Sequence, residues 1–247
     1  MPKFFVDPPY VHEKTIEITG DDAKHIANVL RCQVGEELVL CDGSGYDYFC
    51  KIADISDITK LIVTADILDK RKSETEPDTK IVLFQGLPKA DKMELIIQKA
   101  VELGVDTIVP VSTERTIVKL DKKENKKIER WQKIAEAAAK QSFRGKIPEI
   151  HTKVLSMKEA LSMAKSYNHI LIPYEKEETT KLKDVIPKMK HGESIGIFIG
   201  PEGGFSESEI DQAMSNNAVP VTLGKRILRT ETAGMMVIGI LLHELEE

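Results

Sequence analysis

Two glycine-containing loops carry the residues with the clearest chemical potential. Residues 200–204 (GPEGG) follow the apolar run 195–199, and residues 224–226 (GKR) follow the apolar run 219–223. Glycine allows backbone N–H and C=O groups to approach a ligand within hydrogen-bonding distance. In open α/β sheets, ligands bind beyond the carboxyl ends of the strands. The sequence therefore predicts that both loops border one binding site.

The GPEGG loop has the wrong composition for a phosphate site. A phosphate-binding loop of the Walker type ends in Gly-Lys-Ser/Thr, whereas Gly204 is followed by Phe205 and Ser206. The spacing also departs from GxGxxG, and Glu202 would repel a phosphate. A ligand with a positive charge fits this loop better. A tight structural turn with no ligand remains the alternative interpretation.

The second loop continues as LGKRILRTETAG and places two apolar residues between two arginines. Ile227 and Leu228 are suited to line a flat ring such as adenine, and Arg226 and Arg229 are suited to face an anion such as an RNA phosphate. The alternative is a helix start in which Thr230 or Thr232 is the cap and Glu231 occupies the first turn. That alternative leaves two arginines unexplained at the positive end of a helix.

Alternating apolar and amphipathic segments predict a mostly parallel sheet covered by helices on both faces, from residue 80 onward. Strands are predicted at 81–84, 106–111, near 150, at 169–172 and in the two apolar runs above. Helices are predicted after Asp91, over 124–144, over 156–166, around 181–189, after Ser206 and over 232–246. Asp91 with Glu94, and Ser206 with Glu209, have the spacing of a capping box.

The first 70 residues have a different pattern, with short β-branched and aromatic runs separated by Gly and Asp turns. The turn at Asp42-Gly43-Ser44-Gly45 contains GxG but has no third glycine, so a dinucleotide loop is excluded there. One helix is predicted near residues 23–31, with Ile26, Val29 and Leu30 on its apolar face. The polar segment 71–79 marks a boundary, so we predict domains at 1–72 and 73–247.

Composition limits the classes of function. The chain has 247 residues, 41% of them apolar and 30% charged, with a net charge of −5. The apolar runs are too short for a membrane helix and no signal peptide is evident, so a cytoplasmic location is expected. Residues 115–146 nonetheless hold eleven Lys/Arg against four Asp/Glu. This basic block is either a solvated helix face or a phosphate-binding patch.

Four long motifs resemble one known family. GLPKADKMELIIQKAVELGV, EAAAKQSFR, IGPEGGFSESEI and LGKRILRTETA, together with FFV and HIANVLR in the first half, are similar to the RsmE family. Its members are bacterial 16S ribosomal RNA methyltransferases of the SPOUT superfamily that act on uracil N3. The resemblance implies a SPOUT-type α/β domain with a C-terminal trefoil knot, a PUA-like RNA-binding β-barrel before it, S-adenosylmethionine as methyl donor, and a homodimer with the site near the subunit interface.

The resemblance also implies roles for individual residues. The small ribosomal subunit is the expected partner. The six histidines are scattered and none falls in an HExxH motif, so no metal is expected. No residue is an obvious base for the proton on uracil N3. Arg229 is the candidate for positioning the uracil or stabilising its oxyanion, and Glu231 is the candidate proton acceptor, with helix capping as the alternative role of Glu231. The expected cofactor-binding residues are Ile172, Pro173, Tyr174, Gly200, Pro201, Glu202, Gly203, Leu223, Gly224, Ile227, Leu228 and Arg229. The expected RNA contacts are Lys89, Lys92, Arg115, Gln141, Arg144, Arg226 and the basic helix 119–133.

Two alternative functions stay open from the sequence. The first is an RNA-binding module without catalysis that uses the N-terminal barrel alone. The second is a nucleotide-binding transferase that holds phosphate on the GPEGG amides. The missing lysine and the acidic Glu202 argue against the second alternative.

Overall fold

The computed structural model describes residues 3–57, 61–116 and 124–246. The described chain forms two compact units. The first comprises Met1–Glu76 with Ala139–Ile147, and the second comprises Pro77–Ala138 with Pro148–Glu247. Segment 139–147 therefore belongs to the first unit, whereas the predicted division into residues 1–72 and 73–247 places this segment in the second domain.

The first unit is a five-stranded sheet with the strand order β1-β3-β4-β5-β2. Register shifts at Phe49/Cys50 and Ile52/Asp54 interrupt the pairing of the two long strands, and such bulges increase local twist. One apolar cluster holds the unit together and includes Ile16, Leu38 and Val63. The elements are β1 (Lys3–Phe5), β2 (Thr15–Ile18), β3 (Glu37–Cys41), β4 (Tyr46–Asp57), β5 (Leu61–Lys72), η1 (Pro8–Tyr10), α1 (Gly20–Lys24) and the π-helical turn η2 (His25–Val29).

The apolar face predicted for the helix of this unit is only partly correct. Ile26 is fully buried, but Val29 is 67% exposed and Leu30 is also exposed. The Leu30 N–H donates to the His25 carbonyl, five residues back, so this turn is wider than an α-helical turn. The wider turn rotates the residues after Ile26 away from the core.

Arg144 is a structural residue of the first unit, and its predicted role as an RNA contact is wrong. Its side chain is 4% exposed, and Nη2 lies 2.7 Å from Oε2 of Glu76. The other oxygen of Glu76 accepts from the backbone N–H groups of Gly145 and Lys146. A buried guanidinium that is already paired in this way cannot reach a phosphate outside the unit.

The second unit is built on a sheet in which every recorded strand pair is parallel, which confirms the predicted α/β class. Its order is β12-β10-β11-β6-β7-β8, and β9 also pairs with β7. β7 and β8 lie on one side of β6, and β11, β10 and β12 lie on the other side, with β10 between β11 and β12. The strands are β6 (Lys80–Gly86), β7 (Thr107–Ser112), β8 (Glu149–Ile150), β9 (Leu155–Ser156), β10 (His169–Pro173), β11 (Ser194–Ile199) and β12 (Val219–Val221).

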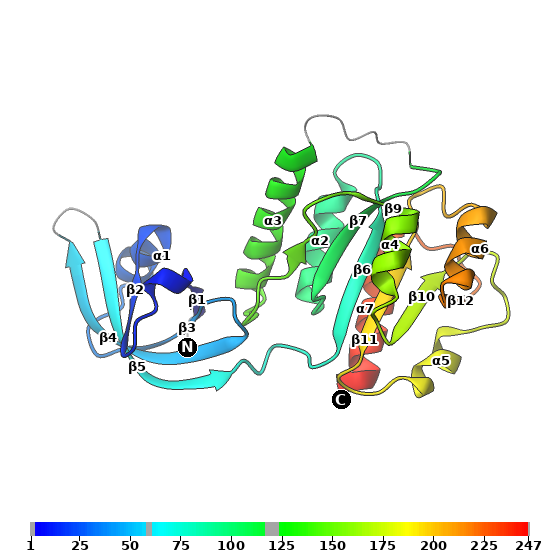
Figure 1. Cartoon of the computed structure of the whole chain (residues 1–247). Helices are drawn as coiled ribbons and strands as arrows, with labels where there is room; N and C mark the ends of the chain where they lie inside the picture. The colour runs from blue at the N-terminus through cyan, green and yellow to red at the C-terminus, as the bar shows by residue number, and fades with distance from the viewer. Residues whose placement is uncertain (1–2, 58–60, 117–123, 247) are drawn as a thin grey trace. The chain divides into compact units, whose positions relative to one another are not determined.

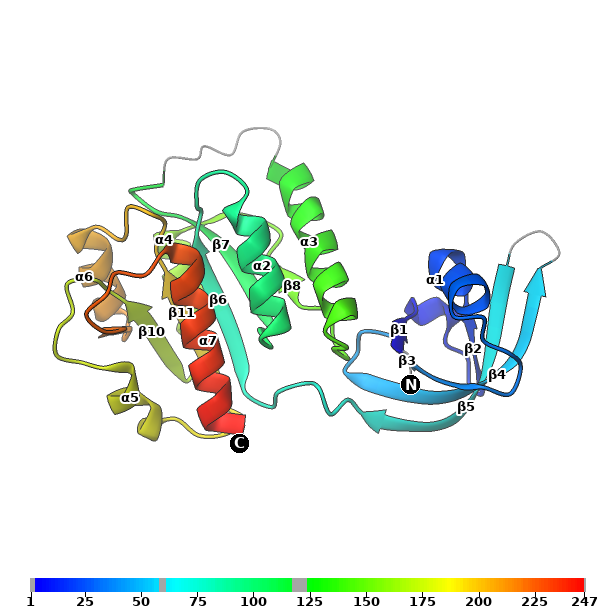
Figure 2. The same ribbon diagram turned by 180° about the vertical axis from the view of Figure 1, so that it is seen from behind.

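Helices cover both faces of this sheet. α4 and α6 lie on the face toward the viewer in Figure 1, and α2 and α7 lie on the face seen in Figure 2. Strand alternation explains the division, because Val82 and Phe84 join the cluster under α4 and α6, whereas Leu83 and Gln85 face Gly234 of α7. The helices are α2 (Lys92–Glu102), α3 (Glu124–Gln141), α4 (Met157–Ala164), α5 (Leu182–Val185), η3 (Ile186–Lys188), α6 (Glu207–Ser215) and α7 (Thr230–Glu246).

The two predicted capping boxes have opposite outcomes. Ser206 accepts from the Glu209 N–H, and the Glu209 carboxylate accepts from the Ser206 N–H, so the box before α6 is confirmed. Asp91 makes no side-chain cap, and the predicted box before α2 is wrong. Glu94 instead pairs with Arg130 of α3 at 2.8 Å, because a salt bridge to a neighbouring helix competes for its carboxylate.

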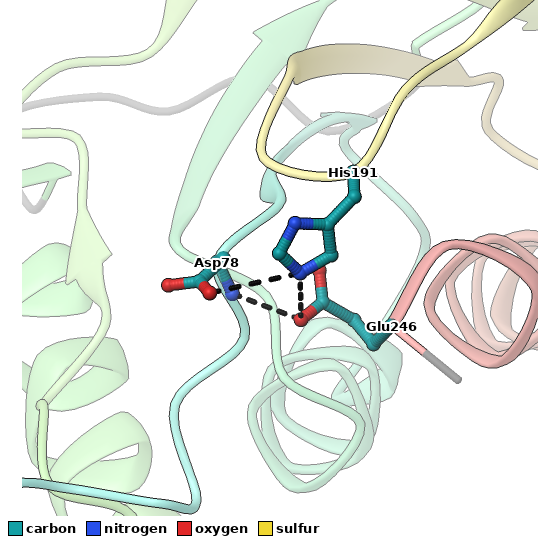
Figure 3. A group of neighbouring side chains, drawn as sticks. All are labelled: Asp78, His191 and Glu246. Carbon is teal, nitrogen blue, oxygen red and sulfur yellow. Dashed lines mark hydrogen bonds and ion pairs between the residues drawn. The ribbon is translucent and has the colours of Figure 1, made fainter.

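The end of α7 is tied to the segment just before β6, at the start of the second unit (Figure 3). The Glu246 carboxylate accepts from the backbone N–H groups of Asp78 and Thr79 at 3.0 and 2.8 Å. Nε2 of His191 lies 3.5 Å from Glu246 and 3.6 Å from Asp78. Burial raises the pKa of Glu246, but these hydrogen bonds outweigh burial and leave the pKa below its usual value.

We expect Glu246→Gln to lower the free energy of unfolding by about 1–2 kcal/mol at pH 7, because two charge-assisted hydrogen bonds weaken. A lowered folded-state pKa stabilises the protein above the unfolded pKa of about 4.3, and the stabilisation is lost as pH falls through the folded value. In denaturant titrations the difference between wild type and variant should therefore be larger at pH 7 than at pH 3. Glu244→Gln, an exposed change in the same helix, is the matched control. A difference that persists undiminished at pH 3 would contradict the assignment.

Candidate ligand-binding site

One large cavity lies at the carboxyl ends of β10, β11 and β12. Its volume is about 1120 Å³, which is large enough for a ligand bigger than a nucleobase. The loops after these three strands and the first turn of α7 supply its walls. The lining residues are Lys92, Pro173–Glu175, Glu177, Glu178, Lys181, Ile199–Phe205, Thr222–Thr230 and Ala233.

The structure brings the two glycine loops of the sequence analysis to this one cavity. GPEGG follows β11, and the GKRIL segment follows β12, as the sheet-edge argument predicts. Pro173, Tyr174, Leu223 and Leu228 also line it, and Ile227 does so with 87% of its surface exposed. Ile172 does not line the cavity. Its side chain is fully buried in the cluster under α4 and α6, because strand alternation points it away from the site.

Two glycines permit the close contacts that shape the GPEGG loop. A Cβ added to Gly86, at the end of β6, would lie 2.8 Å from the backbone nitrogen of Pro201. Gly204 has φ +66°, and its added Cβ would meet Oε1 of Glu175 at 2.9 Å. The loop is therefore pressed between the end of β6 and the segment after β10, and larger residues at these positions would displace it.

A buried hydrogen-bond chain holds this loop against α7. The Thr230 hydroxyl donates to the Gly200 carbonyl at 2.7 Å and accepts from Nε2 of Gln85 at 2.9 Å. Nε2 of Gln85 also donates to the Gly86 carbonyl. The chain joins the end of β6, the loop after β11 and the first residue of α7. Thr230 was predicted only as a possible cap, and no sequence signal pointed to Gln85.

Lys92 lies in the wall of the cavity, between two carboxylates. Nζ is 3.1 Å from Glu202 and 3.4 Å from Glu231. The Glu202 carboxylate also accepts from the Lys89 backbone N–H at 3.2 Å. Burial raises the pKa of Glu202, and the bonds from its own backbone, Lys92 and Lys89 more than offset that, so the pKa is below the ordinary value. The role of Lys92 as an RNA contact stays a prediction, and the structure adds that its ammonium is shared between these two carboxylates.

The two residues predicted to be catalytic both belong to this region. Arg229 is exposed and lines the cavity. The Glu231 side chain is only 13% exposed, and Oε2 has no hydrogen-bond partner in the described part of the chain, although the Lys92 ammonium lies nearby. A shielded carboxylate oxygen with a spare lone pair has the chemistry of a proton acceptor.

The remaining predicted RNA contacts lie on the surface. Lys89, Arg115, Gln141 and Arg226 are exposed, and Nη1 of Arg115 donates to the Gly203 carbonyl at 2.8 Å. Trp131 and Ile128 of α3 face inward, and its basic side chains lie outward as the periodicity predicts. Residues 119–123 of the predicted basic helix lie outside the described residues. The exposed basic residues of α3 are Lys126, Lys127, Arg130 and Lys133.

The segment after β10 contributes more of the cavity than the sequence analysis expected. Glu175, Glu177 and Glu178 line it, whereas only Pro173 and Tyr174 were predicted from this loop. The Glu177 carboxylate accepts from Thr179 and Thr180, and these bonds lower its pKa to about 2. The acidic run EKEE was the available signal, but its distance from the other two loops in sequence concealed its relevance.

The fold and the cavity define an α/β ligand-binding domain with its site at the carboxyl ends of β10, β11 and β12 of a parallel sheet, accompanied by a small β unit. A family model described as an RNA methyltransferase domain matches residues 75–242, and one described as an RNA methyltransferase PUA domain matches residues 18–64. Within the described residues, no helix has the length and apolar content needed to cross a membrane.

Comparison with curated proteins gives long alignments. The chain is 35% identical over 237 residues to ribosomal RNA small subunit methyltransferase E of Bacillus subtilis, covering 94% of this chain and 91% of that protein. It is 34% identical to the protein of the same name from Mesomycoplasma hyopneumoniae, covering 96% and 97%.

Comparison with solved structures agrees. The ribosomal RNA small subunit methyltransferase E of Neisseria gonorrhoeae, solved bound to S-adenosyl methionine, superposes with a TM-score of 0.84 at 34% identity, covering 99% of this chain and 98% of that one. The chain belongs to the RsmE family of RNA methyltransferases. The family resemblance predicted from the motifs is thereby confirmed, and so is the PUA-like character of the first unit.

Proposed function

We propose that this protein transfers a methyl group from S-adenosylmethionine to N3 of a uridine in 16S ribosomal RNA. The observation that carries the proposal is the single cavity formed by the GPEGG loop, the GKRIL segment and the segment after β10. Family membership supports the reaction class, and the relative from Neisseria gonorrhoeae binds S-adenosyl methionine.

The residues present fit this cofactor. Leu223, Ile227 and Leu228 offer apolar surface for adenine, and Gly200 and Gly203 leave backbone groups accessible to polar atoms of the ligand. The carboxylates of Glu175, Glu177 and Glu178 suit a ligand that carries cationic groups. When bound, the cofactor supplies an activated methyl group on a sulfonium, which needs no metal for the transfer.

The protein's part in the reaction is to orient the uracil and to accept its proton. N3 of uracil is protonated at neutral pH, so the new N–C bond requires a base. We assign this role to Glu231, whose shielded Oε2 lacks a hydrogen-bond partner in the described chain. Arg229, exposed on the cavity wall, is assigned to hold the base or the oxyanion that develops on it.

We assign the RNA contacts to Lys89, Arg115, Gln141, Arg226 and the outward face of α3, with the PUA unit as a second RNA-binding surface. The assembled enzyme is proposed to be a homodimer located in the cytoplasm. The C-terminal segment is proposed to form the trefoil knot implied by the family. The substrate partner is the small ribosomal subunit or its RNA.

Incubating the protein with labelled S-adenosylmethionine and small subunits that lack the mark should place label on uracil N3, as read by digestion and mass spectrometry. Arg229→Ala should reduce the rate at least about tenfold while the protein stays folded. If the cofactor binds and no RNA is methylated by the wild type, the enzymatic assignment fails. In that case the non-catalytic RNA-binding alternative, which requires only the PUA unit, would be favoured.

A further inference from the structure

The cationic side chain of Lys92 joins three segments of the cavity wall. It leaves the first turn of α2 and reaches Glu202 of the GPEGG loop at 3.1 Å and Glu231 of the first turn of α7 at 3.4 Å. Its own side chain is one-third exposed, and Glu202 and Glu231 are more buried than that. These contacts therefore differ from the solvent-exposed ion pairs that contribute little to stability.

The two carboxylates would repel each other without this cation. Both lie within 3.4 Å of the same ammonium nitrogen, in a cavity wall that is partly shielded from water. Glu202 has a second donor, because its carboxylate also accepts a hydrogen bond from the Lys89 backbone N–H. Oε2 of Glu231 has no hydrogen-bond partner among the described residues. Lys92 is thus the charged group that the structure places against the Glu231 carboxylate, and its loss leaves that carboxylate free to turn away.

We propose that Lys92 is a positioning residue, which fixes the GPEGG loop and the Glu231 carboxylate in the geometry that cofactor binding and methyl transfer require. The assignment rests on the proposed function. It differs from an RNA-contact role in what it predicts, because a phosphate contact would act on RNA affinity alone. Lys92 acts through Glu202 and Glu231 and does not need to touch the reacting atoms.

The proposal is tested with the variants Lys92→Met and Lys92→Arg. Calorimetry measures their affinity for S-adenosylmethionine, and a methyl-transfer assay measures kcat and the KM for RNA. Lys92→Met should weaken S-adenosylmethionine binding about fivefold or more and lower kcat at least about tenfold, with KM for RNA little changed. Lys92→Arg, which keeps the charge, should recover both to within about threefold of wild type. Lys99→Met is the matched control, since Lys99 lies on the same helix and pairs with Glu102 outside the cavity.

A double-mutant cycle isolates the proposed coupling. Glu202→Gln should cost less cofactor affinity in the Lys92→Met background than in wild type, because the repulsion it relieves exists only there. Additive effects would overturn the proposal, and so would a Lys92→Met variant that raises only KM for RNA or an arginine variant that fails to recover. Cofactor affinity is read without RNA, so this result stays distinguishable from a failure of the methylation assay itself.

Discussion

Replacing Gly86 by alanine is expected to weaken cofactor binding about 5- to 150-fold while leaving the first unit folded. The added Cβ would lie 2.6 Å from Cδ and 2.8 Å from the backbone nitrogen of Pro201. Atoms at these distances overlap, and a backbone nitrogen cannot move aside as a flexible side chain can. The GPEGG loop must therefore shift, and the cavity that it borders changes shape.

The expected magnitude follows from packing. Overfilling a packed site costs about 1–3 kcal/mol of stability, and a comparable loss on cofactor binding raises Kd about 5- to 150-fold. Calorimetric titration with S-adenosylmethionine measures the affinity, and denaturant unfolding measures the stability. Both measurements are needed, because a shifted loop can lose the ligand with little loss of stability.

Gly239→Ala is the control for this substitution. Gly239 lies within α7, and its added Cβ would meet only Cδ2 of Leu103 at an ordinary 3.9 Å. Alanine favours a helix over glycine by about 1 kcal/mol, so this variant should be at least as stable as wild type and bind the cofactor normally. Unchanged cofactor affinity in Gly86→Ala would show that the GPEGG loop tolerates movement and does not define the site.

Thr230→Val should have the second large effect, on stability and on cofactor affinity together. Valine has nearly the shape of threonine but can neither donate to the Gly200 carbonyl nor accept from Nε2 of Gln85. Each buried group left without a partner costs about 1–3 kcal/mol. The Gly200 carbonyl loses this donor, whereas Nε2 of Gln85 keeps its bond to the Gly86 carbonyl. The free energy of unfolding should therefore fall by about 1–3 kcal/mol, and Tm by roughly 2–4 °C for each of these kcal/mol in a unit of this size.

A second threonine in the same turn of α7 provides the control for Thr230→Val. Thr232→Val, an exposed change in the same turn of α7, should leave Tm within about 1 °C of wild type. A Thr230→Val protein as stable as the Thr232→Val control would mean that the hydroxyl makes no net contribution.

Local patterns in the sequence were sufficient to predict the strands and helices of the second unit and the location of the binding cavity. Periodicity predicted the alternating strands and helices from residue 80, because burying an apolar face imposes a period of two or of about 3.6 residues. The capping box at Ser206 and Glu209 was readable because both partners are three residues apart. The glycines at 200 and 224 predicted loops that approach a ligand, and both loops line one cavity.

Contacts between distant residues were decided only by the tertiary structure. Arg144 pairs with Glu76, and Glu94 pairs with Arg130, so an exposed role for the first and a capping role for the second were excluded by partners far away in sequence. Lys92 changed from a surface cation to a link between two carboxylates for the same reason. The energy of a charge or a buried amide depends on what surrounds it in space, and sequence spacing carries that information only within a single turn or strand.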